Sequence, residues 1–130
     1  MALKVELKPN ERIIIGQVVI RNDEQRTRFF IEGEAPILRE KDILTAASAD
    51  SPAKKIYFAI QLMYLTQDTT HQHEIYFQLV RDFLQAAPSS LAYMTEINNT
   101  ILSGELYKAL KAAKKLIAYE AELIANATRV

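Results

Sequence analysis

The side chains of this chain that could do chemistry are mainly arginines and lysines. The first 44 residues contain eight Lys or Arg and eight Asp or Glu, so this region is neutral but rich in cations. A guanidinium group binds phosphate or stacks on a base, and exposed rings such as those of Phe29 and Phe30 also stack on bases. The alternative is that arginines on exposed strands only keep the strand edges soluble. The candidates for an RNA-binding surface in this region are Lys8, Arg26, Arg28, Arg39 and Lys41.

A second group of cations lies on a helix predicted near the end of the sequence. At about 100° per residue, one face of this helix is apolar and consists of Leu106, Leu110, Ala113, Ile117 and Ile124. Lysines gather on the opposite side, and exposed lysines usually mark only a solvated helix face. This lysine stripe is nevertheless a second candidate surface for RNA or an acidic partner, through Lys108, Lys111 and Lys115.

Groups that could support catalysis or bind a metal are scarce. The chain has no Cys and only two histidines, His71 and His73, which would point in different directions on a helix. It has no Gly-x-Ser-x-Gly motif, and its three glycines form no phosphate-binding loop. We therefore expect a binding protein that is not an enzyme and that carries no metal and no cofactor.

Length and composition are those of a small globular protein. The chain has 130 residues, 49% of them hydrophobic, and a formal net charge of zero. Proteins that coat nucleic acid are usually basic overall, so an RNA site here would be a local patch. The first residues do not resemble a signal peptide, and no stretch has the roughly 20 apolar residues of a membrane span. We expect a cytoplasmic protein with no membrane partner.

The first 44 residues have the period-two pattern of β-strands. Leu3, Val5 and Leu7 alternate with charged residues, which predicts a strand with one buried face. Further strands are predicted at 12–15, 18–20, 27–31 and 35–39, followed by a helical turn at 40–44. The polar residues 22–25 are predicted to be the tip of a hairpin.

Helical patterns follow this region. Ser51-Pro52 is a favourable helix start, and apolar residues then recur every three or four positions until about Thr66. A second helix is predicted to be capped by Thr69 and Thr70 and to stop at Pro88. A third helix should end near Gly104, and a fourth should run from about 105 to 127.

The predicted fold class is therefore α+β. A small antiparallel β unit of about five short strands occupies 1–44, a linker 45–51, and a bundle of about four helices 52–130. Five short strands make a small core and leave strand edges open, so we also predict a homodimer.

Several runs of the sequence resemble those of one protein family. They are Met1–Pro9, Glu11–Gly16, Phe30–Leu44, Ser51–Tyr57 and Gln61–Tyr64. In these runs the chain resembles FlbT, the small flagellar regulator of alphaproteobacteria. The resemblance implies a post-transcriptional regulator that binds the 5′ untranslated region of flagellin mRNA, and usually represses translation or promotes decay during flagellum assembly. It also implies an association with the flagellar protein FlaF.

The β unit alone is also similar, in the order of its residues, to the CsrA/RsmA translational regulators. The similarity rests on Asn10-Glu11, Ile14-Ile15-Gly16, Ala35-Pro36 and Arg39-Glu40. It implies a five-stranded, strand-exchanged dimer that clamps an RNA loop, with RNA-binding positions at Lys8 and Arg39. The sequence departs from that family where Leu7 replaces an arginine and Asn10 replaces a glycine.

Two kinds of function fit these observations. The first is regulation by direct binding to a flagellin mRNA leader. The second is a protein-interaction adaptor, in which the helical half binds a flagellar partner and any effect on RNA is indirect.

Overall fold

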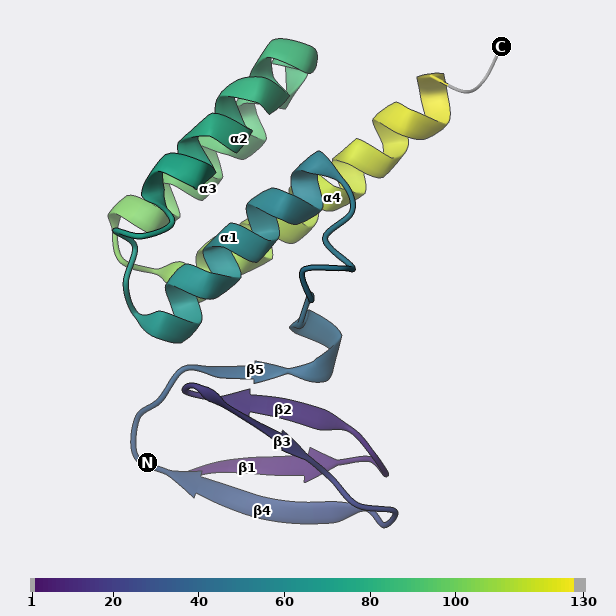
Figure 1. Cartoon of the computed structure of the whole chain (residues 1–130), viewed down its shortest axis with the longest axis vertical. Helices are drawn as coiled ribbons and strands as arrows, with labels where there is room; N and C mark the ends of the chain where they lie inside the picture. Colours follow the sequence, from purple (N-terminus) through teal and green to yellow (C-terminus); the bar gives the residue numbers. More distant parts are fainter. Residues whose placement is uncertain (1, 128–130) are drawn as a thin grey trace. The chain divides into compact units, whose positions relative to one another are not determined.

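The computed structural model of this chain describes residues 2–127 and is α+β, as the sequence predicts. It divides into two compact units, Met1–Ile43 and Leu44–Val130. We call the first the β unit and the second the helical unit, after the strands and α-helices that they contain (Figure 1).

Five short strands form two small antiparallel sheets in the described part of the β unit. One sheet pairs β1 with β4, and the other has the strand order β3-β2-β5. A single turn of 3-10 helix, Glu40–Asp42, follows β5, where a helical turn is predicted. The strands are Ala2–Leu7 (β1), Arg12–Ile15 (β2), Val18–Arg21 (β3), Thr27–Glu32 (β4) and Ile37–Arg39 (β5).

Residues 22–25 are not the tip of a hairpin, so that prediction is wrong. Because β3 pairs with β2 and β4 pairs with β1, this segment carries the chain from one sheet to the other. The side chain of Asn22 is only 9% exposed and binds backbone carbonyl oxygens. In sequence, a polar run between two strands looks the same whether it turns at the surface or crosses between sheets.

Alternation along β1 produces the core of the β unit. Val5 and Leu7 form a buried cluster with Ile13 of β2, and partly buried residues surround it. Leu3, predicted to share the buried face, is instead 50% exposed because it lies toward the open end of β1. The partly buried residues are Ile15, Phe29, Ile31 and Ile37. A cluster of three buried side chains is a small core, even for a unit of this length.

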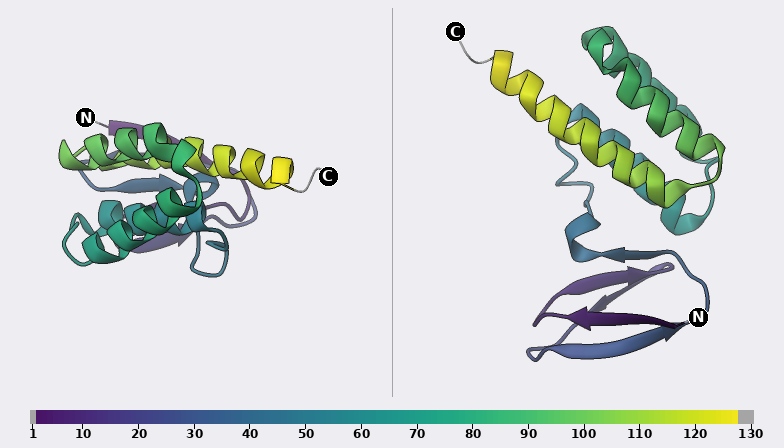
Figure 2. Two further views of the ribbon diagram at one scale, coloured as in Figure 1. Left: turned by 90° about the horizontal axis from the view of Figure 1, so that it is seen from above. Right: turned by 180° about the vertical axis from the view of Figure 1, so that it is seen from behind.

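Four α-helices form the described part of the helical unit. In the views of Figure 2, α4 packs along both α1 and α3, and α2 packs against α1. Pro88 lies just after the end of α2 and Gly104 just after the end of α3, as predicted. The helices are Pro52–Thr66 (α1), His73–Ala86 (α2), Leu91–Leu102 (α3) and Leu106–Ala127 (α4), with a 3-10 turn at Pro88–Ser90.

The start of α1 combines a predicted cap with an unpredicted one. Ser51 Oγ accepts a hydrogen bond from the Lys54 N–H at 3.2 Å, and Pro52 is the first helical residue. The Ala53 N–H donates to Glu120 Oε2 of α4 at 2.8 Å, although the two residues are 67 positions apart. Glu120 is 7% exposed, so a buried carboxylate satisfies an N–H at the positive end of the α1 dipole.

The helix α2 starts later than predicted. Thr69 and Thr70 do not cap it; its first residue is His73, and Gln72 makes no side-chain cap. The Asp68 carboxylate accepts the Thr70 N–H at 2.9 Å and lies 2.5 Å from His71 Nδ1, which holds these residues in a turn. This local hydrogen bonding competes with the helix for the same backbone.

The buried face of α4 is rotated from the predicted apolar face. Leu110 and Ala113 are buried as expected, but Ile124 is 56% exposed. Alanines allow close approach of two helices, and α4 contacts its neighbours on a face that combines three alanines with Leu110 and Leu116. The buried residues of α4 are Ala109, Leu110, Ala112, Ala113, Leu116 and Glu120.

Hydrogen bonds hold residues 44–51 within the helical unit. Gln61 is buried in α1; its Oε1 accepts the Leu44 N–H at 2.9 Å, and its Nε2 donates to the Leu44 carbonyl oxygen at 2.8 Å. Ala49 is also buried. Leu44 is therefore bound to α1, and the segment predicted to be a linker at 45–51 lies within the helical unit.

Candidate nucleic-acid interface

Cations of the β unit converge around one surface depression, which we call the basic hollow. Its lining contains five Lys or Arg residues and two carboxylates, so it carries a net positive charge within a neutral unit. Four of the predicted RNA-binding residues, Lys8, Arg26, Arg39 and Lys41, lie in it. The complete lining is Lys4, Glu6, Lys8, Glu11, Arg26, Arg39 and Lys41.

The remaining candidate of the β unit, Arg28, lines a smaller depression beside it. This second depression shares Glu6 and Arg26 with the basic hollow and also includes Leu7 and Thr27. The structure therefore brings all five predicted cations of the β unit to two adjoining depressions. Sequence reasoning left out Lys4, which β1 presents on the same face as Glu6 by simple alternation with Val5 and Leu7.

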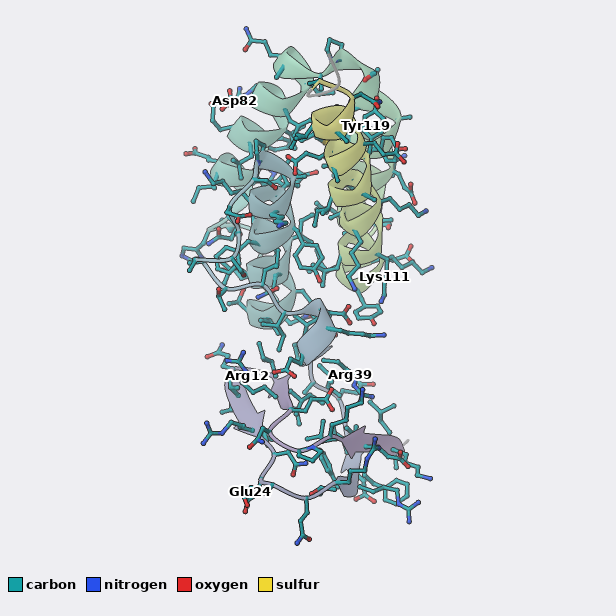
Figure 3. All side chains as sticks on the ribbon, turned by 90° about the vertical axis from the view of Figure 1, so that its right-hand side faces the viewer. Arg12, Glu24, Arg39, Asp82, Lys111 and Tyr119 are labelled. Atoms are coloured by element: carbon teal, nitrogen blue, oxygen red, sulfur yellow. The ribbon has the colours of Figure 1, made fainter. Side chains whose placement is uncertain are left out.

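Arg39 joins the two sheets beneath this surface. Its guanidinium group donates a hydrogen bond to the Glu6 backbone carbonyl oxygen at 2.8 Å, which links β5 to β1. Arg39 is labelled in Figure 3. A guanidinium group has five N–H donors, so this bond leaves others for an anion. Arg39 can therefore both position the hollow and contact a ligand.

Asn22 fixes the loops that carry Lys8 and Arg26. Its Nδ2 lies within hydrogen-bond distance of three carbonyl oxygens, those of Leu7 at 3.2 Å, Lys8 at 2.9 Å and Gln25 at 2.8 Å. Its Oδ1 accepts the Thr27 hydroxyl at 2.8 Å, and its backbone N–H donates to the Glu11 carbonyl oxygen at 2.8 Å. Because one buried side chain ties both loops together, the spacing of their cations is defined. The sequence gives no direct signal for this role.

The turn that carries Lys8 is closed by a second carboxylate of the hollow. Glu11 Oε1 accepts the Lys8 N–H at 2.8 Å, and the Glu11 N–H donates to the Lys8 carbonyl oxygen at 3.1 Å. Asn10, between them, has φ +64°, a left-handed conformation that asparagine tolerates better than most residues. Asn10 can therefore fill a position where glycine would otherwise be expected.

The two phenylalanines proposed for base stacking point to opposite faces of β4. Phe30 is 64% exposed and lies opposite Lys4 on the outer face of the β1–β4 sheet. Phe29 packs against the buried cluster of Val5, Leu7 and Ile13, so it is not available for stacking. Only Phe30 can offer a ring face beside the cations.

The lysines of α4 are engaged within the helical unit. Lys108 Nζ lies 2.6 Å from Glu105 Oε2, and Lys115 Nζ lies 3.2 Å from Glu96 Oε1. Lys111 Nζ lies 5.1 Å from the centre of the Tyr107 ring, in a cation–π arrangement (Figure 3). The hydrogen bond between Lys108 and Glu105 raises the pKa of Lys108 and lowers the pKa of Glu105. An anion would have to compete with these partners.

Other kinds of site are not evident in residues 2–127. In this range, no three or more His, Cys, Asp or Glu residues are grouped so that they could hold a metal ion. The His73 ring packs edge-on against Phe77, with ring centres 4.4 Å apart. None of the helices described is sufficiently long and apolar to cross a bilayer.

Comparison with known proteins gives the family. The family model described as flagellar protein FlbT matches residues 3–124. The chain is 60% identical over 124 residues to the probable flagellum biosynthesis repressor protein FlbT 1 of Bradyrhizobium diazoefficiens, covering 95% of this chain and 85% of that protein.

Two further relatives span most of both chains. The probable flagellum biosynthesis repressor protein FlbT of Rhodopseudomonas palustris is 50% identical over 97% of this chain and 100% of its own length. The flagellum biosynthesis repressor protein FlbT of Caulobacter vibrioides is 32% identical over 97% of this chain and 92% of its own length. No solved structure matches the chain. The family match and these full-length similarities show that the chain belongs to the FlbT family.

Proposed function

We propose that this chain is a post-transcriptional regulator of flagellin expression that binds the 5′ untranslated region of flagellin mRNA. Relatives are named flagellum biosynthesis repressors, which supports a role in controlling flagellar expression. The observation that carries direct RNA binding is the basic hollow, where five cations of a neutral unit lie together. The chain would act in the cytoplasm, where the message is translated.

The geometry of the hollow supports single-stranded RNA as the ligand. Lys8, Arg26 and Lys41 can contact phosphates, and Phe30 can stack on an unpaired base. Glu6 and Glu11 can accept hydrogen bonds from exocyclic amino groups of bases. A protein bound to the leader near the ribosome-binding site would block access of the ribosome. Translation would then fall without any bond in the RNA being broken.

The alternative function, an adaptor for a flagellar protein such as FlaF, is supported by a different surface. An apolar depression lies between the start of α1, the end of α2 and the last turns of α4. Its lining includes Phe83, Leu123 and Ile124, and Ile124 is 56% exposed. A helix from a protein partner could cover these side chains.

Salt-dependent binding of a flagellin leader RNA by the purified full chain tests the first proposal. We expect Lys8→Gln/Arg26→Gln to weaken binding at least tenfold. Its slope of log K against log salt should fall by about 1.4, since each phosphate contact to a single strand contributes about 0.7.

The matched control is Lys108→Gln/Lys115→Gln, which removes the same charge from α4. This variant should retain binding within about twofold, because both lysines already have partners in the helical unit. Equal losses in both variants would contradict the assignment to the basic hollow. If the wild-type chain does not bind the leader, the adaptor function is favoured instead.

A further inference from the structure

The strand β3 is the end strand of its sheet and exposes apolar residues along most of its length. In the order β3-β2-β5, one side of β3 pairs with β2 and the other side faces away from the sheet. Val18, Val19 and Ile20 are 57%, 61% and 40% exposed. Because successive side chains of a strand point to opposite faces, both faces of β3 are apolar and accessible.

The strand β3 differs from the other end strands described because it has fewer charged residues. Natural proteins protect sheet edges with charged residues, bulges or proline. The outer face of the β1–β4 sheet carries charged residues on both strands. The strand β5 is preceded by Pro36 and ends with Arg39. The only charged residue of β3 is Arg21, at its last position. This strand therefore lacks the usual protection against pairing with another strand.

Hydrogen bonding in the neighbouring strand shows which backbone groups of β3 point outward. The Gly16 N–H donates to the Pro36 carbonyl oxygen at 2.7 Å, toward β5. Alternation along β2 then directs the backbone groups of Ile13 and Ile15 toward β3, where they face Ile20 and Val18. The N–H and C=O of Val19 consequently point away from the sheet.

We propose that β3 pairs antiparallel with the β3 strand of a second copy of this chain, centred on Val19. Two Val19 residues that face each other would exchange both of their outward N–H···O=C bonds. The three-stranded sheet of each copy would continue across this edge. The inference is independent of RNA binding and concerns a surface apart from the basic hollow.

The sequence of β3 is complementary to itself in this register. Val18 of one copy lies opposite Ile20 of the other, so apolar residues meet on both faces. Arg21 lies opposite Gln17, so the arginines of the two copies do not face each other. A twofold axis through Val19 makes the contact isologous, so each β3 edge is used once and the contact closes at two chains. The short strand indicates a weak, concentration-dependent dimer.

Mass in solution, measured by analytical ultracentrifugation on the full chain, gives the first test. At high concentration the wild-type mass should approach twice the 14.8 kDa of one chain. Val19→Lys should return it to one chain at all concentrations. The matched control, Leu102→Lys, alters an 85% exposed residue of α3 and should leave the dimer intact. Circular dichroism verifies that both variants fold.

Single cysteines test the register, because the chain has no Cys of its own. Val19→Cys should form a disulfide-linked dimer under mild oxidation, since hydrogen-bonded opposite residues have Cα atoms about 5.5 Å apart. Val18→Cys should cross-link poorly, because its Cα atoms would be roughly 8 Å apart, beyond the reach of a disulfide.

Three results would overturn the proposal. They are a wild-type mass of one chain up to the highest soluble concentration, a dimer that persists in Val19→Lys, and equal cross-linking by the two cysteine variants.

Discussion

The two units contain the same number of charges but arrange them differently. Each has eight cationic and eight acidic residues in its sequence. In the β unit, five cations line one depression together with only two carboxylates, and one of these, Glu11, also closes a turn. In the helical unit, Lys108 and Lys115 lie against carboxylates and Lys111 lies over a tyrosine ring.

This difference shows that net charge does not identify a binding surface. In the helical unit, residues three or four positions apart lie on one face, where Lys108 meets Glu105 and Lys111 meets Tyr107. Packing of α3 against α4 brings Glu96 to Lys115. The loops and strand ends of the β unit instead bring together cations from residues 4, 8, 26, 39 and 41. Hydrogen bonds of Asn22 and Arg39 hold the segments that carry these cations.

The largest effect on stability and leader binding is expected from a substitution in the core of the β unit. Ile13 is fully buried beside Val5 and Leu7, so Ile13→Ala should lower the free energy of unfolding by about 2–5 kcal/mol. Chemical denaturation measures this loss, and leader binding should fall with it. Leu3→Ala, at a 50% exposed position of β1, is the control and should change stability much less. Similar losses in both variants would show that the cluster is not the core of this unit.

A smaller effect on stability and leader binding is expected from substitution of Asn22. This variant tests the arrangement of the cations in the β unit without changing any charge. Asn22→Ala removes the donor for carbonyl oxygens at the ends of two loops, which should lower stability by about 1–3 kcal/mol. Leader binding should weaken even under conditions where the variant remains folded, because Lys8 and Arg26 lose their fixed spacing.

Asn99→Ala in α3 is the matched control for this variant. Asn99 is exposed, so neither the free energy of unfolding nor leader binding should decrease. Unchanged leader binding by folded Asn22→Ala would show that the hollow does not depend on the positions of its loops.

The smallest effect is expected for the ion pair of Lys108 of α4 with Glu105, where a pKa is measured. The hydrogen bond from Lys108 lowers the pKa of Glu105, so this pair contributes stability at neutral pH and loses it as the pH falls through that lowered pKa. Lys108→Gln should raise the pKa of Glu105 toward its ordinary value, as measured by NMR titration. Lys111→Gln is the control and should leave that pKa nearly unchanged. An ordinary pKa of Glu105 in the wild-type chain would mean that Lys108 is available to other anions.

Local patterns in the sequence predicted most of the elements. Period two located the strands, and Ser51-Pro52 located the start of α1. Interactions between distant residues account for what was missed. The path of residues 22–26 depends on where Asn22 is buried, and the face of α4 depends on how closely its alanines let α1 and α3 approach.

The candidate site was predictable residue by residue but not as a surface. The presence of Arg or Lys in a strand-rich region suggested each of the five candidate cations of the β unit, which are Lys8, Arg26, Arg28, Arg39 and Lys41. That they meet at two adjoining depressions depends on the crossing between sheets, which the sequence does not show. The contact of Lys115 with Glu96 of α3 required the packed helices, whereas those of Lys108 with Glu105 and Lys111 with Tyr107 follow from local helical spacing.

The contact between Ala53 and Glu120 has a consequence for the order in which the chain folds during translation. The start of α1 leaves the ribosome 67 residues before the carboxylate that completes its cap, so the helical unit cannot reach its final packing until α4 has been made. The strands of the β unit all lie within the first 43 residues. Because domains fold as they emerge, we expect the basic hollow to be complete while the helical unit is still being synthesised.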